Sequence, residues 1–437
     1  MNRSRRSVPH GLLLAALLVF AGSGSAAVLH AGPGQLLGSI RDAIRLAAPG
    51  DTVFVHPGFY AEGNLVVDKP LALIGIGYPV LDGQHQAEIL TIQASGTRVQ
   101  GFEIRNSGQM STIDIAGIKV LAVSRVSIEQ NRLFDCNFGI YLSNTVNCLV
   151  KYNHIAGTPA EEQNTGNGIH LWKCDSAAIE HNYVTGHRDG IYFEFVTQSR
   201  IFGNLSEGNI RYGLHFMFSH EDRYERNTFR RNGAGVAVMY SRKVQMYENT
   251  FEHNWGGAAY GILLKDISDS EVECSRFVHN TAGIYMEGCS RIRFRHNEFR
   301  ENGWALRIQA SCDANVFKDN GFYGNSFDVA TNGTMVLNDF NGNFWDHYEG
   351  YDLDRDGTGD IPYRPVRLFS MIAERMPHAL ILMRSFMVYL LDRAEKTLPV
   401  LTPVRLLDEQ PRMQPVLHES DCQEFGPDPL SFAIHPA

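Results

Sequence analysis

The chain has 437 residues, a formal net charge of −9 at pH 7 and 44% apolar residues. This length allows a large core, and the mild acidity argues against nucleic acid as a partner. Asparagine and glycine are frequent and helix-forming runs are scarce, which favours an all-β fold.

Residues 1–27 have the features of a secretory signal peptide. A basic head with Arg3, Arg5 and Arg6 precedes a short apolar run over 11–22, and "GSGSAAV" offers small residues for cleavage. The apolar run is too short to span a membrane. We therefore expect export to a bacterial periplasm.

The next segment, "IRDAIRLAAPGDTVFVHPGFYAEGNLVVDKPLALIGIGYPVLDG", is typical of the first coils of a solenoid. An amphipathic helix over 39–48 would cap the first coil and cover its open edge. Short strands predicted over 71–74, 89–92 and 99–104 would continue the stack.

From residue 131 onwards the sequence repeats, most often every 22 or 23 residues. One series consists of Asn131, Asn153, Asn182, Asn204, Asn227, Asn249, Ser275, Asn297 and Asn320. A second series consists of Gly139, Gly168, Gly190, Gly213, Gly235, Gly261, Gly283 and Ala305. The interval between successive members becomes longer at the same places in both series. We therefore interpret residues 157–167 as an inserted loop. This pattern predicts a right-handed parallel β-helix over residues 28–345.

Stacked coils lie about 4.8 Å apart, so equivalent side chains fall over one another. We interpret the asparagines as a structural ladder that satisfies buried backbone groups, and not as catalytic residues. Residues one and three positions after each glycine are apolar and should face the core, while residues two and four positions after it should face outward.

The outward positions of the middle coils hold His170, Trp172, Tyr192, Glu194, His215, Met217 and Met239. Thioether and imidazole groups suit Cu(I), and methionine gains little on an exposed strand. The predicted copper ligands are His170, Glu194, His215, Met217 and Met239. The alternative is a chance cluster or a protein contact patch.

The same outward face supports a second interpretation. Trp172, Tyr192 and Tyr285 could stack on sugars, as aromatic residues do in polysaccharide-acting β-helices. A glycosidase needs two carboxylates about 5–10 Å apart, whereas Glu194 has only Glu287, four coils away. We therefore expect no enzymatic activity, and keep a polysaccharide-binding or polysaccharide-modifying protein (lyase, hydrolase or epimerase) as the alternative.

Seven cysteines in an oxidising compartment leave at least one without a partner in the chain. Cys289 and Cys312 each stand eight residues before a ladder position, so they occupy the same site on adjacent coils. Their Cα atoms should lie within disulfide range. We predict a stack of two buried thiols, with a disulfide as the alternative.

Residues 346–370 form an Asp-rich loop and linker. The spacing D-x-D-x-D-G-x-G-D resembles the first half of a calcium loop, with Asp352, Asp354, Asp356 and Asp360 as candidate ligands. The twelfth position is Tyr363, where an EF-hand has a glutamate. A solvated acidic turn is the alternative.

An amphipathic helix is predicted over 371–398, with Pro377 opening its regular part and Pro399 ending it. Leu380, Met383, Met387 and Leu390 would form one apolar stripe for a partner or a membrane surface, and packing on the solenoid is the alternative. The tail over 399–437 is rich in proline.

The signal peptide, "AIRLAAPGDTVFVHPGFY", the Asn-Gly solenoid, "NFWDHYEGYDLDRDGTGDIPYRP" and the Met-rich terminal helix together resemble the NosD family of nitrous oxide reductase maturation proteins. The resemblance covers essentially the whole mature chain. It implies a periplasmic, non-catalytic protein associated with the inner membrane through an ABC-type permease and its cytoplasmic ATPase. It also implies that copper passes from a copper chaperone towards nitrous oxide reductase. The family supplies no motif for the copper ligands.

Overall fold

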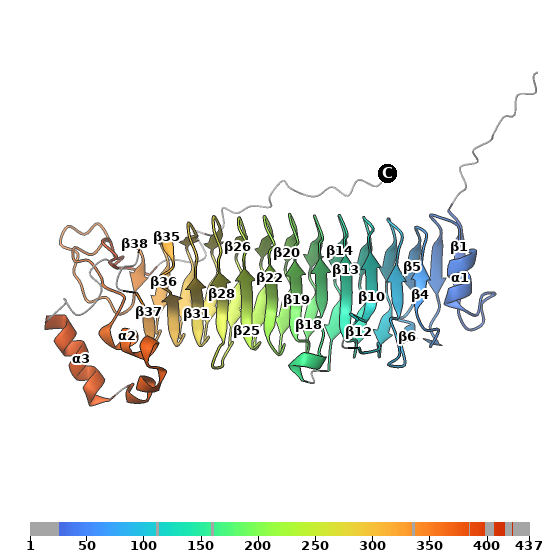
Figure 1. The fold of residues 1–437 in the computed structure, drawn as a ribbon. Coiled ribbons are helices and arrows are strands. Elements are labelled where there is room, and N and C mark those ends of the chain that lie inside the picture. The colour runs from blue at the N-terminus through green and yellow to red at the C-terminus, as the bar shows by residue number, and fades with distance from the viewer. Residues whose placement is uncertain are drawn as a thin grey trace, which may run out of the picture.

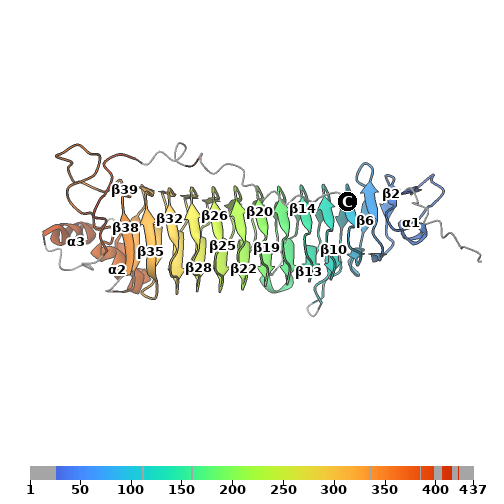
Figure 2. The same cartoon turned by 90° about the horizontal axis from the view of Figure 1, so that it is seen from above.

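The computed structural model describes residues 26–110, 113–158, 161–333, 337–383, 385–397, 406–415 and 422. Residues 1–25 of the predicted signal peptide and most of the predicted tail lie outside this part of the chain. The described residues form a right-handed parallel β-helix (Figure 1). The helix α1 (Ile40–Leu46) lies at one end, and α2 (Leu368–Arg375), η2 (Pro377–Leu382) and α3 (Phe386–Thr397) lie at the other, as Figure 2 also shows.

Three parallel sheets form the walls, and over the described residues they hold 14, 13 and 12 strands. Sheet A contains β1 (Val28–Ala31), β2 (Thr52–Val55), β5 (Ala72–Gly75), β8 (Arg98–Gln100), β11 (Ser127–Glu129), β14 (Leu149–Lys151), β17 (Ala178–Glu180), β20 (Arg200–Phe202), β23 (Arg223–Glu225), β26 (Gln245–Tyr247), β29 (Glu271–Glu273), β32 (Arg293–Arg295), β35 (Asp313–Lys318) and β38 (Leu337–Asn341). Sheet B contains β3 (Phe59–Tyr60), β6 (Val80–Asp82), β9 (Glu103–Arg105), β12 (Arg132–Phe134), β15 (His154–Ala156), β18 (Tyr183–Thr185), β21 (Leu205–Glu207), β24 (Thr228–Arg230), β27 (Thr250–Glu252), β30 (Arg276–Val278), β33 (Glu298–Arg300), β36 (Gly321–Tyr323) and β39 (Phe344–Trp345). Sheet C contains β4 (Leu65–Val67), β7 (Leu90–Ile92), β10 (Ala116–Leu121), β13 (Phe138–Ser143), β16 (Ile169–Trp172), β19 (Asp189–Glu194), β22 (Tyr212–Met217), β25 (Ala234–Met239), β28 (Tyr260–Lys265), β31 (Ala282–Glu287), β34 (Trp304–Ile308) and β37 (Phe327–Thr331).

The predicted inward positions are confirmed, because all of them are fully buried on sheet C. They are Ile140, Ile169, Ile191, Leu214, Val236, Ile262, Ile284 and Leu306, followed two residues later by Leu142, Leu171, Phe193, Phe216, Val238, Leu264, Met286 and Ile308. The downstream core also contains a run of stacked rings, with Phe299 and Phe322 4.9 Å apart. Burial of apolar area is the main stabilising contribution of such a core.

The predicted asparagine ladder is also confirmed. The Oδ1 atom of Asn227 accepts hydrogen bonds from the backbone N–H and the amide of Asn204, both at 2.9 Å. Its Nδ2 atom donates to Ile201 O at 2.9 Å and to Asn249 Oδ1 at 3.0 Å. Each coil thereby satisfies buried groups of the coil before it.

A second ladder, which the sequence analysis did not identify, runs five residues after the first. It consists of Asn209, Asn232, Asn254, Asn280, Asn302 and Asn325, linked by the same side-chain and backbone hydrogen bonds. The backbone N–H of His187 donates to Asn209 Oδ1 at 3.1 Å, so His187 stands at the head of this ladder.

The first ladder ends on a carboxylate from the tail. Asp408 is fully buried, and its Oδ2 atom accepts from the backbone N–H of Asn343 at 2.9 Å and from Trp345 Nε1 at 2.9 Å. A buried carboxyl group whose oxygens accept several hydrogen bonds is not left unsatisfied. Residues 406–415 therefore cap the solenoid.

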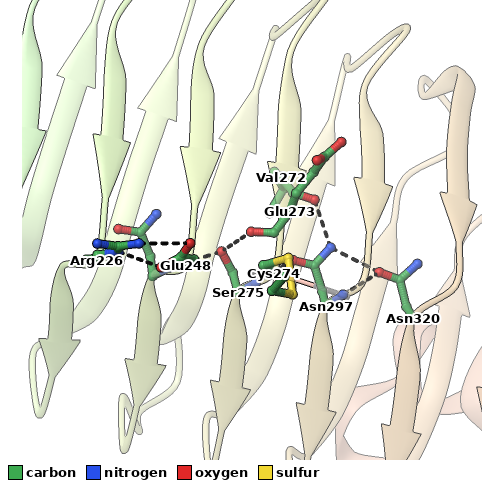
Figure 3. The surroundings of a disulfide bond; sticks show 10 residues. Arg226, Glu248, Val272, Glu273, Cys274, Ser275, Asn297 and Asn320 are labelled. Atoms are coloured by element: carbon green, nitrogen blue, oxygen red, sulfur yellow. Dashed lines mark hydrogen bonds and ion pairs between the residues drawn. A yellow bond between two sulfur atoms is a disulfide. The ribbon is translucent and has the colours of Figure 1, made fainter. Parts of the chain in front are cut away.

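A disulfide joins the tail to the solenoid between Cys274 and Cys422, whose Cα atoms are 5.9 Å apart. Cys274 occupies the turn between sheets A and B, where one residue per coil has a left-handed backbone, and Figure 3 shows it in line with Arg226 and Glu248. This pair was not predicted from the sequence. The other five cysteines are free and buried, so the predicted thiol state of Cys289 and Cys312 is confirmed.

The N-terminal cap is confirmed. The Ser39 side chain accepts from the backbone N–H of Asp42 at the start of α1, which buries Ile40, Ala43 and Ile44 against the first coil. The strand predicted over 99–104 was wrong as a single element. It is divided into β8 and β9 by a bend at Gly101, whose φ is +81°.

The single C-terminal helix over 371–398 was also wrong. It consists of α2, the 3₁₀ turn η2 that begins at Pro377, and α3. Met383 has an extended backbone (φ −54°, ψ 132°), which interrupts the helical path before α3 begins. The predicted stripe is therefore divided. Leu380 and Met383 pack against Phe327 and Phe369, whereas Met387 and Leu390 are exposed.

Candidate functional site

A column of aromatic and imidazole rings runs along the outer face of sheet C. Strand register aligns Tyr141, His170, Tyr192 and His215 on consecutive coils. The His170 ring lies 4.7 Å from Tyr141 and 4.7 Å from Tyr192, and the His215 ring lies 5.0 Å from Tyr192. We call these four side chains the ring column.

The ring column is less exposed than the sequence predicted. His170 and His215 are only 8% and 5% exposed, so the expectation of an open outward face was wrong at these two positions. Neighbouring rings cover them from above and below, and the inserted loop adds Asn167, whose amide lies 3.0 Å from His170 Nδ1.

His170 does not share a site with the other copper candidates. The Tyr192 ring lies between His170 and His215, which are two strands apart, roughly 10 Å at the usual strand spacing. Burial, together with the positive charge of Arg188, lowers the pKa of His170 to about 3, so the imidazole is neutral at neutral pH. Its position supports a packing role within the column.

His215 is contacted by the buried Asp189 and the partly exposed Arg211, neither of which was predicted from the sequence. Arg211 donates to both carboxylate oxygens of Asp189, at 2.9 and 2.5 Å. His215 Nδ1 lies 3.4 Å from Asp189 Oδ2, while its Nε2 atom is buried without a hydrogen-bond partner. Arg211 Nη2 lies at the same distance, 3.4 Å, from His215 Nδ1. Only the tautomer with the proton on Nδ1, which donates to Asp189, leaves the Nε2 lone pair for a metal.

The charge of Asp189 is maintained by the same contacts. Burial alone would raise the pKa of Asp189, but hydrogen bonds from His215 and Arg211 outweigh it and lower this pKa. The sequence signal was a carboxylate directly before Gly190, where the neighbouring coils place Asn167 and Tyr212. A single sequence gives no reason to distinguish that carboxylate from a solvated one.

Beside the ring column, a second outward column brings Glu194, Met217 and Met239 together on adjacent strands. All three side chains are partly exposed. The Tyr192 hydroxyl lies 3.3 Å from Glu194 Oε2 and 3.7 Å from Met217 Sδ. Burial raises the pKa of Tyr192 to about 12, so this hydroxyl is protonated and acts as a donor.

Strand register aligns Glu194, Met217 and Met239, and His215 stands two residues before Met217 on β22. Two thioethers and an imidazole are a donor set that suits Cu(I). The same column does not provide a glycosidase pair. Glu194 and Glu287 are separated by four strand spacings, roughly 19 Å.

The Asp-rich loop gathers three of its four predicted ligands. Asp352, Asp354 and Asp356 each offer an oxygen, all within 4.8 Å of one another. The Asp360 carboxylate instead accepts from the backbone N–H of Leu353 at 2.7 Å. The pKa of Asp354 is affected by Asp356 in two ways. A hydrogen bond from the backbone N–H of Asp356 lowers this pKa, but the negative charge of the Asp356 carboxylate raises it, and the net pKa is raised. Carboxylate oxygens fit a hard cation such as Ca²⁺.

An apolar surface covers the C-terminal end of the solenoid. Its exposed members are Met376, Ile381, Leu382, Phe386, Met387, Tyr389 and Leu390. We call these residues the terminal apolar surface. In the described part of the chain, no helix has the length and apolar character required to cross a membrane. An apolar patch of this kind is typical of a contact with another molecule.

The chain is similar in sequence to proteins of known family. Residues 152–350 match the family described as periplasmic copper-binding protein (NosD). A "Probable ABC transporter binding protein NosD" of Pseudomonas aeruginosa is 31% identical over 393 residues, which cover 85% of this chain and 91% of that protein. A protein of the same description from Stutzerimonas stutzeri is 28% identical, over 89% of this chain and 92% of that protein.

Solved structures share the fold at low identity. The catalytic unit of an α-1,3-glucanase from Streptomyces thermodiastaticus is 15% identical with a TM-score of 0.55, covering 70% of this chain and 65% of that one. The Dettilon tailspike protein is 13% identical with a TM-score of 0.54, covering 71% of this chain and 70% of that one. At this identity the likeness shows the β-helix fold alone.

Proposed function

The chain belongs to the NosD family, and on this basis we propose that it carries copper in the periplasm for the maturation of nitrous oxide reductase. The family is described as periplasmic and copper-binding, and the curated relatives are named as ABC transporter binding proteins. The proposal adds the destination of the copper and the place where it is held.

The proposed copper site consists of His215 Nε2 with the sulfur atoms of Met217 and Met239, and Glu194 at its edge. The observation that supports it is the buried His215 Nε2, which has no hydrogen-bond partner while Asp189 lies against the opposite ring nitrogen. Met217 and Met239 are partly exposed, so copper would enter from their side and reach the imidazole last. Soft neutral donors can take up and release Cu(I) without thiol chemistry.

Delivery requires partners on both sides. We propose that a copper chaperone loads the site, that nitrous oxide reductase receives the metal, and that an ABC-type permease with its cytoplasmic ATPase holds the protein at the inner membrane. The terminal apolar surface is the proposed contact with the permease. Met387 and Leu390 are its central residues, while Leu380 and Met383 support it from below.

We propose that the protein is not an enzyme. The wide separation of Glu194 and Glu287 and the naming of the curated relatives as binding proteins support this proposal. The alternative, a polysaccharide lyase, hydrolase or epimerase, rests on the partly exposed Trp172 and Tyr285 of sheet C. Release of sugar from a uronate polymer by the purified protein would favour that alternative.

We further propose Ca²⁺ as the occupant of the Asp-rich loop, through Asp352, Asp354 and Asp356 with backbone carbonyls and water. Tyr363 contributes nothing at the twelfth position, because its hydroxyl lies 3.1 Å from Asp328 Oδ2. Calcium titration of the wild-type protein and of Asp352→Asn tests this site. Equal affinity in the two proteins would contradict the assignment.

The copper site is tested by competition for Cu(I) against a chromophoric chelator. We expect wild-type binding tighter than micromolar and a loss of more than about 100-fold in His215→Ala/Met217→Ala, which removes two donors. His170→Gln is the matched control, since it changes an imidazole of the same column that lies out of reach. Equal loss in the control, or no loss in the double variant, would refute the ligand assignment.

The permease contact is tested by copurification from membranes. Met387→Glu/Leu390→Glu should abolish recovery of the permease with the tagged chain, because charges cannot be buried in an apolar interface. Leu36→Glu, at a residue 99% exposed near the opposite end of the solenoid, is the control and should leave recovery unchanged. Recovery that is insensitive to the double variant would place the contact elsewhere.

A further inference from the structure

The last coil of the solenoid contains a buried carboxylate where earlier coils have no room for one. Register aligns Trp304 with Phe327 and Leu306 with Val329. Asp328 therefore occupies the position that Ala305 and Gly283 occupy on the two preceding coils. A Cβ atom at Gly283 would already lie 2.6 Å from Ala305 O of the next coil. At Asp328 the strands of sheet C end, which leaves room for a longer side chain.

Two further ligating side chains meet Asp328 at this end. His347 Nδ1 lies 3.2 Å from Asp328 Oδ2 and 3.0 Å from Asp346 Oδ1. Asp328, Asp346 and His347 each offer one ligand atom, all within 4.8 Å of one another. Asp346 and His347 directly follow β39, so two different sheets contribute to the cluster.

The hydrogen bonding of Asp328 is incomplete. The residue is 3% exposed, and its Oδ1 atom is buried without a hydrogen-bond partner. An unpaired buried carboxylate oxygen is costly, and a bound cation would satisfy it. A protonated His347 held between the two carboxylates is the alternative arrangement, but it contacts Oδ2 and leaves Oδ1 unsatisfied.

We propose that Asp328, Asp346 and His347 bind a divalent transition-metal ion of the zinc class. Two carboxylates and one imidazole are a common ligand set for Zn²⁺, whereas Cu(I) prefers sulfur and Ca²⁺ prefers oxygen alone. The positively charged Arg367 lies in the same region. Both carboxylates are therefore needed to make the local charge favourable for a cation.

The ion would have a structural role. Val366 pairs with Val329 of β37, and Ser370 Oγ of α2 donates to Val329 O at 3.2 Å. Asp328 precedes Val329, so a metal at Asp328 would fix the coil on which α2 rests. The site would thus stabilise the base of the terminal apolar surface. It is independent of the copper site, because its residues and its metal class are different.

Zn²⁺ titration of the untagged, chelator-treated protein at pH 7.5 tests this proposal. We expect one Zn²⁺ bound in the micromolar range or tighter, and a rise of a few degrees in the thermal midpoint on adding the ion. Asp328→Asn and His347→Gln should weaken Zn²⁺ binding by more than about tenfold and abolish the rise in the thermal midpoint. Loss of a residue that only hydrogen-bonds to a metal ligand already lowers metal affinity about tenfold or more, and loss of the ligand itself should lower it at least as much.

Two control variants separate this site from the others. Asp352→Asn and His215→Ala/Met217→Ala should retain wild-type Zn²⁺ binding. His347 is partly exposed, so His347→Gln is expected to fold, and it decides the outcome if Asp328→Asn does not. No Zn²⁺ binding by the wild type, or unchanged binding in His347→Gln, would overturn the proposal and leave the Cu(I) experiment unaffected.

Discussion

The asparagine ladders and the ring column are two products of the same stacking geometry, with different chemical results. In the ladders, a side-chain oxygen accepts from the coil before and an amide donates to the coil after, so the buried polar groups of each asparagine are paired. In the ring column, equivalent positions hold rings of different kinds, and His215 Nε2 has no partner.

The difference indicates where a repeat protein places a site. In a ladder of identical side chains, every buried polar group is already hydrogen-bonded, so none remains to bind a ligand. The ring column departs from the repeat, and each departure introduces a group that the stack alone does not satisfy. Asp328 follows the same rule, since it is a buried carboxylate at a position where earlier coils carry glycine or alanine.

The largest effect is expected from Asn227→Ala, which breaks the first ladder. The substitution leaves the N–H and amide of Asn204 without their acceptor and Ile201 O without its donor, in a fully buried environment. Each unsatisfied group costs roughly 1–3 kcal/mol, so the free energy of unfolding should fall by about 3 kcal/mol or more. Urea unfolding measures the loss, and Cu(I) affinity of the folded protein should not change.

The matched control for this variant is Glu248→Ala. It removes an exposed ion pair with Arg226 on the same two coils, at the corner shown in Figure 3. Exposed pairs contribute less than about 1 kcal/mol. If Asn227→Ala cost no more than this control, the ladder would not be the stabilising element described here.

A smaller effect, dependent on pH, is expected from His187→Asn at the head of the second ladder. Burial lowers the pKa of His187 from 6.5 to about 4 in the folded protein. Between these values the unfolded chain binds a proton that the folded chain does not, so stability falls as the pH drops from 6.5 towards 4. The limiting slope for one proton is about 1.4 kcal/mol per pH unit.

Asparagine at position 187 removes this titration and extends the ladder by one member. The free energy of unfolding of the variant, measured between pH 7.5 and pH 4, should therefore decrease less steeply than that of the wild type. Above pH 6.5 the two slopes should agree. Parallel profiles over the whole range would show that His187 is not the buried neutral base described here.

Much of the fold could be predicted from the sequence, because the same residue pattern recurs from coil to coil. The period, the inward apolar positions and the first ladder are visible in one chain, since each is present in many coils. The second ladder was missed although it lies five residues from the first. The contact of Asp408 with Asn343 and the Cys274–Cys422 disulfide were missed because they occur once and join distant segments.

The candidate site was only partly predictable for the same reason. Periodicity placed His215, Met217 and Met239 on one face, but it could not show that neighbouring rings bury His215 or that Tyr192 separates it from His170. The C-terminal helix failed for a different reason. Its apolar pattern fits one continuous helix, whereas Pro377 and the extended Met383 divide it, and packing on Phe369 decides which residues turn inward.

The smallest effect is expected from Tyr192→Phe, which changes one atom of the ring column. The ring keeps its stacking on His170 at 4.7 Å and its contact with His215 at 5.0 Å. Only the hydroxyl that approaches Glu194 and Met217 Sδ is lost. A single partly buried hydrogen bond contributes about 0.5–1.5 kcal/mol, so stability should change by no more than that.

Cu(I) affinity gives the sharper measurement on the same variant. With the hydroxyl removed, the Met217 sulfur is free to bind the metal, and affinity should rise by up to about fivefold, which corresponds to roughly 1 kcal/mol. Tyr192→Ala is the informative companion, because it removes the ring that separates His170 from His215 and should reduce both stability and affinity. A large loss of Cu(I) binding in Tyr192→Phe would instead assign the hydroxyl a direct role at the metal. The ring column would then depend on specific polar contacts as strictly as the asparagine ladders do.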